Sequence, residues 1–199
     1  SIVITNVMGY LRYLPSKKIY IDHILELKVG MTIEPKKLIS KLINSGYCRD
    51  TVVSKTGEIA VRGFVVDIFP VDEENPVRIE FFDDEIESIR YFDTDTQKSI
   101  KNINSIIVKP YFEFLVDEDV SEEEFGKQKY LPKYNKVESI SDYLDDSITI
   151  FKDYDQIEVG FNHILEEIVT YKESKDVDFS GNENKCWFYL ISYYLYKVG

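Results

Sequence analysis

The sequence predicts an α+β fold, in which one helix packs against a small antiparallel sheet. Apolar residues recur at helical spacing after Pro35, and between residues 48 and 93 the spacing changes to a period of two. The 199 residues include 15 Tyr and 12 Phe, and aromatic side chains favour strands. A hydrophobic fraction of 44% is enough for a packed core and excludes a disordered chain.

One helix is expected to begin near Pro35 and to end at Gly46. Proline suits the first helical turn because its missing N–H would have no partner there. Glycine is the residue that most often ends a helix, since it adopts the left-handed conformation freely. Between these two residues, four apolar side chains share one face: Leu38, Ile39, Leu42 and Ile43.

Strands are expected where apolar and polar residues alternate between turn-forming residues. Four successive strands are predicted, at residues 48–53, 58–69, 76–82 and 85–93. A strand at 24–29 and another within 99–110 complete a meander of roughly 90 residues, helix included. Outside it, the sequence predicts strands at residues 1–7 and 147–151 and a helix from Asp155.

The charge of the chain is divided unevenly. The net charge of −12 is made up of −1 from residues 1–109 and −11 from residues 110–199. Nucleic-acid affinity rests on Lys and Arg, so the acidic second part would repel a phosphate backbone. Four of the five arginines lie within 42 residues: Arg49, Arg62, Arg78 and Arg90. Their clustering indicates recognition of a partner, or else long apolar stems that pack on strands.

Residue types argue against catalysis. Cys48 and Cys186 lack the spacing of a disulfide framework or a zinc site. The acidic stretch FFDDEIE lacks the accompanying GxxxxGK[ST] loop that a helicase ATPase needs. His23 and His163 have no metal-binding or catalytic partners at suitable spacing, and no nucleophile motif is present. We therefore expect no catalytic residue, no metal and no cofactor.

The location expected from the sequence is the cytoplasm, with no membrane partner. No apolar run reaches the ~18 residues of a membrane span. The first residues, SIVITNVMGYL, lack the basic region and cleavage site of a signal peptide. Two cysteines without a pairing pattern fit a reducing compartment.

A mixed polar and aromatic surface is expected on one side of the sheet. Residues two apart on a strand share a face, so alternation places Arg62, Arg78 and Glu80 opposite the apolar core side. Phe64 and Phe82 are expected on the same side. Arginine, glutamate and exposed phenylalanine together are typical of a protein-binding surface. The alternative is a solvated sheet face with an Arg–Glu cross-strand pair worth under ~1 kcal/mol.

Two motifs resemble those of a known family: GEIAVRGFVVDIFP at residues 57–70 and NPVRIEFFDDEIESIRYFDTDTQKSI at 75–100. They are similar to the UvrB-homology region of the bacterial transcription-repair coupling factors (Mfd). FDTDTQKSI has the coupling-factor form, whereas UvrB itself typically reads FDxxTG. The flanking residues 39–53 and 129–151 are similar as well, and the resemblance covers about residues 2–170.

The resemblance implies that the sheet docks UvrA, the damage-recognition ATPase of nucleotide excision repair. In the family, arginines and an acid on one sheet face make the contacts, and position by position these are Arg49, Arg62, Arg78 and Glu80. Phe64 and Phe82 join this set through strand alternation. Three positions depart from the family: Ala60 replaces a further UvrB arginine, Asp83 replaces a glycine, and Phe64 replaces small or acidic residues.

The resemblance also implies three parts. These are the end of a truncated α/β subdomain (1–18), an α+β docking domain (19–109), and an acidic return segment (110–199) of a RecA-like subdomain without its nucleotide loop. The implied function is a non-catalytic fragment that brings UvrA to stalled RNA polymerase. RNA polymerase and DNA would be contacted only by other parts of the parent protein. The alternatives are a UvrB fragment, a DNA-contacting part of an ATP-driven translocase, and a purely structural domain.

Overall fold

The computed structural model describes residues 2–116, 120–127 and 130–175. The chain forms two compact units, one made of residues 14–137 and one to which residues 2–13 and 138–175 belong. The domain boundaries expected from the sequence, after residues 18 and 109, stay predictions. The expectations for residues 176–199 lie outside the described residues.

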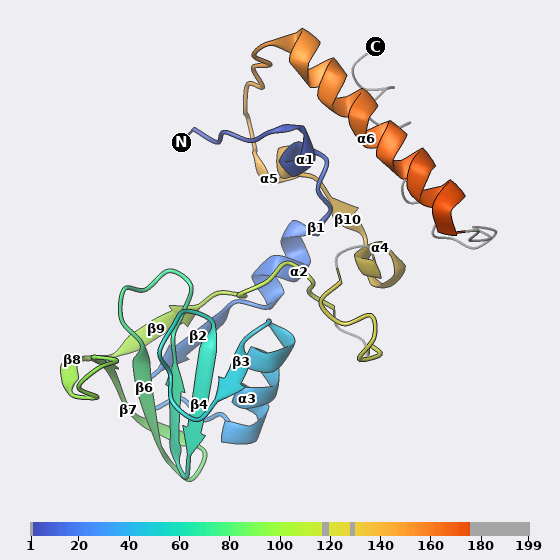
Figure 1. Ribbon diagram of the computed structural model, residues 1–199. Coiled ribbons are helices and arrows are strands. Elements are labelled where there is room, and N and C mark those ends of the chain that lie inside the picture. The colour runs from blue at the N-terminus through green and yellow to red at the C-terminus, as the bar shows by residue number, and fades with distance from the viewer. Residues whose placement is uncertain (1, 117–119, 128–129, 176–199) are drawn as a thin grey trace. The chain divides into compact units, whose positions relative to one another are not determined.

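The unit of residues 14–137 has the predicted α+β fold (Figure 1). Its elements are β1 (Leu14–Pro15), α2 (Lys17–Asp22), β2 (Leu25–Lys28), α3 (Pro35–Asn44), β3 (Cys48–Asp50), β4 (Glu58–Arg62), β5 (Val65–Ile68), β6 (Val77–Phe82), β7 (Glu85–Phe92), β8 (Ser99–Ile103), β9 (Ser105–Val108) and α4 (Leu131–Tyr134). Strands β3 to β8 form one sheet in chain order, and β2 pairs with β9. A further short strand, β10 (Val137–Glu138), pairs with β1.

The single long strand predicted at residues 58–69 is wrong, because the chain turns back within it. Arg62 pairs with Val65 across an antiparallel hairpin of β4 and β5. The two residues between them form the turn, and Gly63 has a φ of +60°. Such a φ is open to glycine without steric cost. The sequence pattern hid the turn because both strands are apolar and only two residues separate them.

The sheet is also not a pure antiparallel meander, because β3 runs parallel to β4. The return between them is made by residues 51–57, and Glu58 organises this loop. Its carboxylate accepts hydrogen bonds from the backbone N–H of Ser54 (2.8 Å) and of Lys55 (3.0 Å). These bonds hold the pKa of Glu58 below its usual value, with burial acting in the opposite direction. A buried carboxylate therefore fixes a loop that the sequence suggested only as a turn.

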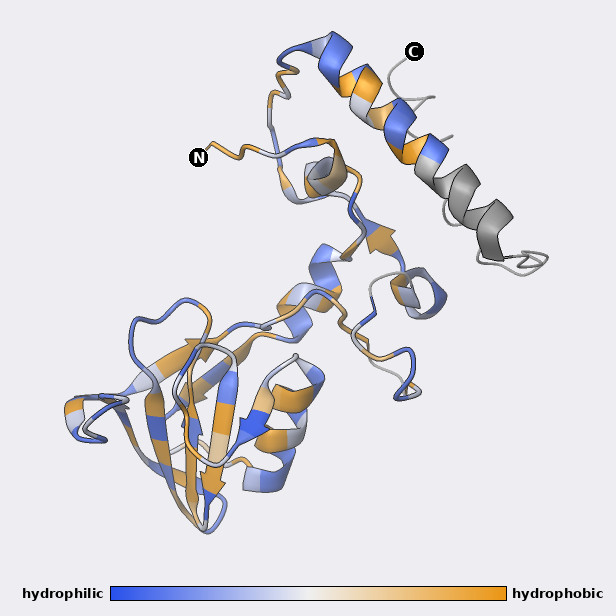
Figure 2. Ribbon diagram, viewed as in Figure 1, coloured by the Kyte–Doolittle hydropathy of each residue, from blue (hydrophilic) through white to orange (hydrophobic). Residues whose placement is uncertain are grey.

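The core lies on one side of the sheet, under α3. Leu38 and Leu42 of α3 are fully buried against alternate residues of the strands, among them Ile59, Val66 and Ile79. Strands β2 and β9 add Leu25, Leu27, Ile106 and Val108 to the same core. Figure 2 shows this alternation as bands of apolar and polar residues along the strands. The predicted helix is confirmed: it begins at Pro35, and Gly46 follows it with a φ of +92°.

Asp83, in the turn between β6 and β7, has a φ of +52° and lies in the left-handed region. Side chains other than glycine are strained there. We expect Asp83→Gly to raise the free energy of unfolding by roughly 0.5 kcal/mol, because the relieved strain exceeds the added chain entropy. Asp84→Gly is the matched control, since Asp84 does not have a positive φ. It should lower stability. Urea denaturation measures the change in stability of each variant, and equal changes in the two variants would contradict the prediction.

The second unit contains helices α1 (Val7–Tyr10), α5 (Ile140–Tyr143) and α6 (Tyr154–Lys175). The helix expected from Asp155 is confirmed by α6. The strands predicted at residues 1–7 and 147–151 are wrong: the described residues there have no strand partner. Ile4 and Ile148 are 92% and 90% exposed. A β-branched sequence does not form a strand without a neighbour that accepts its backbone hydrogen bonds.

Within the described ranges, 2–116, 120–127 and 130–175, no helix has the length and apolar character needed to cross a bilayer. In the same residues, no cluster of three or more His, Cys, Asp or Glu is placed to hold a metal ion.

Candidate protein-interaction site

The face of the sheet opposite α3 carries charged residues in adjacent rows. The register aligns Asp67 of β5 with Arg78 of β6, and Arg78 with Arg90 of β7. In the next row, Glu80 aligns with Ser88, and Arg62 with Val65. We call this side, defined by Arg62, Asp67, Arg78, Glu80 and Arg90, the ionic face.

Asp67 is the centre of the ionic face. Its side chain is 1% exposed, and it accepts hydrogen bonds from both neighbouring arginines. Arg78 binds it through two nitrogens, with Nε 2.7 Å from Oδ1 and Nη2 2.8 Å from Oδ2. Arg62 Nη2 is 2.8 Å from the same Oδ2. Burying a carboxylate is costly unless hydrogen-bonded partners of this kind accompany it, so Asp67 and the two arginines form one unit.

Arg78 is less exposed than alternation along the strand suggested. Its side chain is 16% exposed. The guanidinium lies 4.4 Å from the centre of the Phe92 ring and donates to Gln97 Oε1 at 3.0 Å. Phe92, Val53 and Ala60 form a small second core on this side of the sheet. The hydrogen bonds to Asp67 raise the pKa of Arg78, and burial opposes them. Arg78 is therefore largely committed to contacts within the chain.

Glu80 is paired with a residue that the sequence did not assign to the site. Arg90 donates to both of its carboxylate oxygens, at 2.5 and 2.7 Å, and Ser88 Oγ donates at 2.8 Å. The hydrogen bonds from Arg90 are the main cause that lowers the pKa of Glu80 to about 2. The three arginines and two carboxylates of the ionic face leave one net positive charge.

The ion pair of Glu80 and Arg90 predicts that part of the stability of the fold is lost in acid. The folded-state pKa of about 2 lies below the ordinary value of 4.5. The charged pair therefore stabilises the fold above pH ~4.5, and this stabilisation is lost as the pH falls through 4.5 towards 2. We expect Glu80→Gln to be less stable than wild type near neutral pH and to lose less stability between pH 5 and pH 2.5. Urea denaturation at several pH values measures this, and parallel curves for the two proteins would contradict it.

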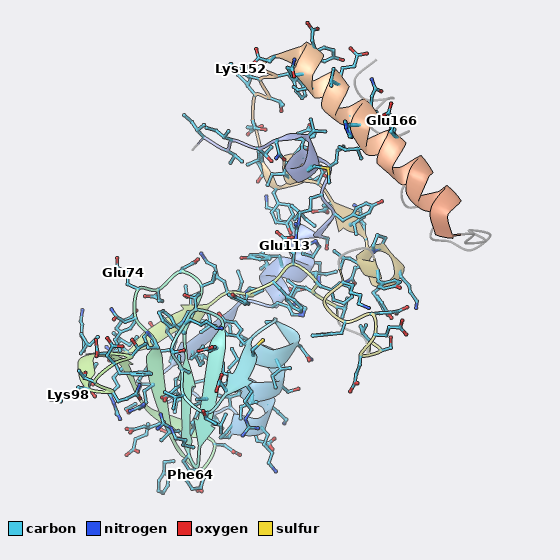
Figure 3. The ribbon with its side chains drawn as sticks, viewed as in Figure 1. Phe64, Glu74, Lys98, Glu113, Lys152 and Glu166 are labelled. Carbon is cyan, nitrogen blue, oxygen red and sulfur yellow. The ribbon has the colours of Figure 1, made fainter. Side chains whose placement is uncertain are left out.

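Two exposed phenylalanines lie at the turns beside the ionic face. Phe82 follows Glu80 by two residues on β6 and is 71% exposed. Phe64 is in the β4–β5 turn, is 63% exposed, and accepts a backbone hydrogen bond from Phe81. Figure 3 shows Phe64 at one end of the sheet and Glu74 at the other. Large exposed aromatic side chains of this kind are enriched in protein interfaces.

The structure brings together five of the six residues that the sequence assigned to the site. Arg62 on β4 and the pair Arg78 and Glu80 on β6 lie on the two strands that flank β5, with Phe64 and Phe82 at the turns. Arg49 is separate: it is exposed on the edge strand β3, in register with the core residue Ile59. Its register therefore places it in a row that faces the core side of the sheet. The expectation that all four charged residues share one face does not hold for Arg49.

Sequence reasoning missed Asp67, Arg90 and Gln97 as members of the site. Asp67 falls inside the single strand predicted at residues 58–69, whereas the hairpin places its side chain between those of Arg62 and Arg78. Arg90 is one of the four clustered arginines, but the sequence pattern alone does not pair it with Glu80. The signal that could have located both is the hairpin register, because it aligns Asp67, Arg78 and Arg90 in one row.

This domain matches a known protein family. Residues 25–114 match the family model described as the UvrB interaction domain. The match includes all strands from β2 to β9, and therefore the whole ionic face. The chain contains a UvrB interaction domain. The domain begins at β2, the first strand of the core, and ends after β9, the last.

The proteins that are similar to this chain in sequence are transcription-repair-coupling factors. One from Bacillus subtilis is 42% identical over 115 residues, which is 58% of this chain and 10% of that protein. One from Staphylococcus epidermidis is 33% identical over 179 residues, 88% of this chain. One from Staphylococcus aureus is 34% identical over 177 residues. These confirm the resemblance seen in the motifs. The chain spans about 15% of the length of the staphylococcal relatives.

Proposed function

We propose that this chain is a non-catalytic protein-interaction segment that docks UvrA through the ionic face and the two adjoining phenylalanines. The observation that carries the proposal is the UvrB interaction domain itself, which includes every strand of the ionic face. Its exposed groups are of the kinds that dominate interface energetics: a half-exposed arginine and two aromatic rings.

The name of the relatives, transcription-repair-coupling factor, supports a wider role as part of the proposal. By docking UvrA, the segment recruits nucleotide excision repair to stalled RNA polymerase in the cytoplasm. RNA polymerase and DNA are bound by other parts of the parent protein. Within this segment, the acidic residues 110–199 disfavour contact with a phosphate backbone. The chemistry of the segment is recognition alone.

The direct test is calorimetric titration of the chain with purified UvrA, with Arg62→Ala beside the wild type. Arg62 is the arginine of the ionic face with the greatest exposure, at 50%. Truncation of an arginine anchor typically costs ~2 kcal/mol, so the variant should bind at least about thirtyfold more weakly. Lys37→Ala is the matched control, because it removes an exposed positive charge from α3.

The proposal fails if the wild-type chain does not bind UvrA. It also fails if Arg62→Ala binds as tightly as wild type while both are folded by circular dichroism. A loss of the same size in Lys37→Ala would show a general charge effect and would contradict docking through this face.

A further inference from the structure

Asp67 cannot contact a binding protein directly, because its side chain is 1% exposed. Among the described residues, the three hydrogen bonds to its side chain all come from arginines. It nevertheless shares Oδ2 with the arginine of the ionic face that has the greatest exposure. Whatever Asp67 contributes to docking must therefore be transmitted through another side chain.

The two arginines depend on Asp67 to different degrees. Arg78 also bonds Gln97 and packs over the Phe92 ring, so several contacts fix its position. Arg62 is 50% exposed, and Asp67 is its only side-chain partner among the residues that the structure describes. The Arg62 guanidinium therefore owes its orientation to one carboxylate oxygen.

We propose that Asp67 is a positioning residue for docking: it holds Arg62 in the orientation in which the partner binds it. The inference rests on the proposed function, because it concerns the same face. A side chain that is ordered before binding loses less rotamer freedom when the complex forms. One Nη of Arg62 is held by Asp67, and the rest of the guanidinium stays available to an acidic group of UvrA.

Asp67→Asn is the variant that tests the role, because it keeps the side-chain shape and removes the negative charge. Released from the carboxylate, Arg62 must be ordered during binding, and we expect roughly tenfold weaker affinity for UvrA. Asp72→Asn is the matched control. It makes the same change at an exposed carboxylate that pairs with Lys109, and its affinity should equal that of wild type.

A double-mutant cycle separates positioning from a general structural effect. If Asp67 acts through Arg62, Asp67→Asn should weaken binding by less than twofold when Arg62 is already alanine. A tenfold loss in that background would overturn the inference, as would an Asp67→Asn variant that binds like wild type. If wild type binds and Arg62→Ala is weakened while Asp67→Asn is not, only this inference fails. If wild type does not bind UvrA, the proposed function fails and this inference with it.

A second measurement needs no variant and covers the case in which Asp67→Asn does not fold. The Nε–H group of Arg62 in the free wild-type chain should have a nuclear magnetic relaxation order parameter close to that of rigid backbone, about 0.85. A value typical of a freely moving exposed side chain, under about 0.6, would overturn the inference.

Discussion

Asp67→Ala is expected to lower the free energy of unfolding by about 3 kcal/mol. The substitution removes the carboxylate that binds Arg78, whose side chain is 16% exposed. Breaking a buried ion pair by removing one partner is strongly destabilising, because a charge remains buried without compensation. The value lies at the low end for such pairs because Gln97 and the Phe92 ring still contact Arg78, and Arg62 is half-exposed.

Urea denaturation of wild type and Asp67→Ala measures this loss. Asp72→Ala is the control, since Asp72 forms an ion pair with Lys109 in which both side chains are about half-exposed. Exposed pairs contribute little, so its effect should stay within about 0.5 kcal/mol. Equal stability of Asp67→Ala and wild type would mean that the arginines on this face do not depend on the buried carboxylate.

Leu42→Ala is expected to cost about 3 kcal/mol of stability and to leave the affinity for UvrA unchanged. Leu42 is fully buried between α3 and the sheet. Its truncation loses apolar burial and leaves a cavity, which together cost 2–5 kcal/mol in well-packed cores. The cavity lies on the side of the sheet opposite the ionic face, so the docking residues keep their contacts.

The two effects are measured on the same variant. Urea denaturation gives the stability, and calorimetry at a temperature well below the unfolding midpoint gives the affinity of the folded protein. A large loss of affinity in folded Leu42→Ala would place the docking surface on the α3 side. Unchanged stability would mean that α3 is not packed as described.

Much of the fold follows from periodicity and from backbone-specific residues. The helix between Pro35 and Gly46 is predictable because its start, its apolar face and its end are all marked in the sequence. Strands β6 and β7 are likewise predictable from alternation across the short Asp83–Asp84 turn. Opposite faces of the sheet then separate Ile79 of the core from Arg78 and Glu80 of the ionic face.

What periodicity does not reveal is which strand neighbours which. The parallel pairing of β3 with β4 rests on a seven-residue return held by Glu58, and no local pattern marks it. Likewise, Asp67 and Arg62 are five residues apart in one apolar run, and only the hairpin brings their side chains together. To predict a charged pair across two strands, the pairing register of the strands must be known, and the register depends on where the turns lie.

The wrong prediction of a strand at residues 147–151 has a different cause. That segment has strand-forming residues, yet Ile148 and Ile150 are 90% and 84% exposed. Strand propensity reflects the fit to a pleated, half-buried surface rather than a preference of the backbone alone. In the described residues no neighbouring strand provides such a surface, so propensity alone gives the wrong assignment.

The measurement that most directly tests docking by this face is oxidative footprinting of the chain with and without UvrA. Phe64 and Phe82 are 63% and 71% exposed. Tyr111 and Tyr154 are 46% and 56% exposed and belong to none of the strands that carry the ionic face. We predict that UvrA lowers the oxidation of Phe64 and Phe82 and leaves that of the two tyrosines unchanged. Binding of UvrA with protection of the tyrosines, and with Phe64 and Phe82 still fully oxidised, would contradict docking through the ionic face.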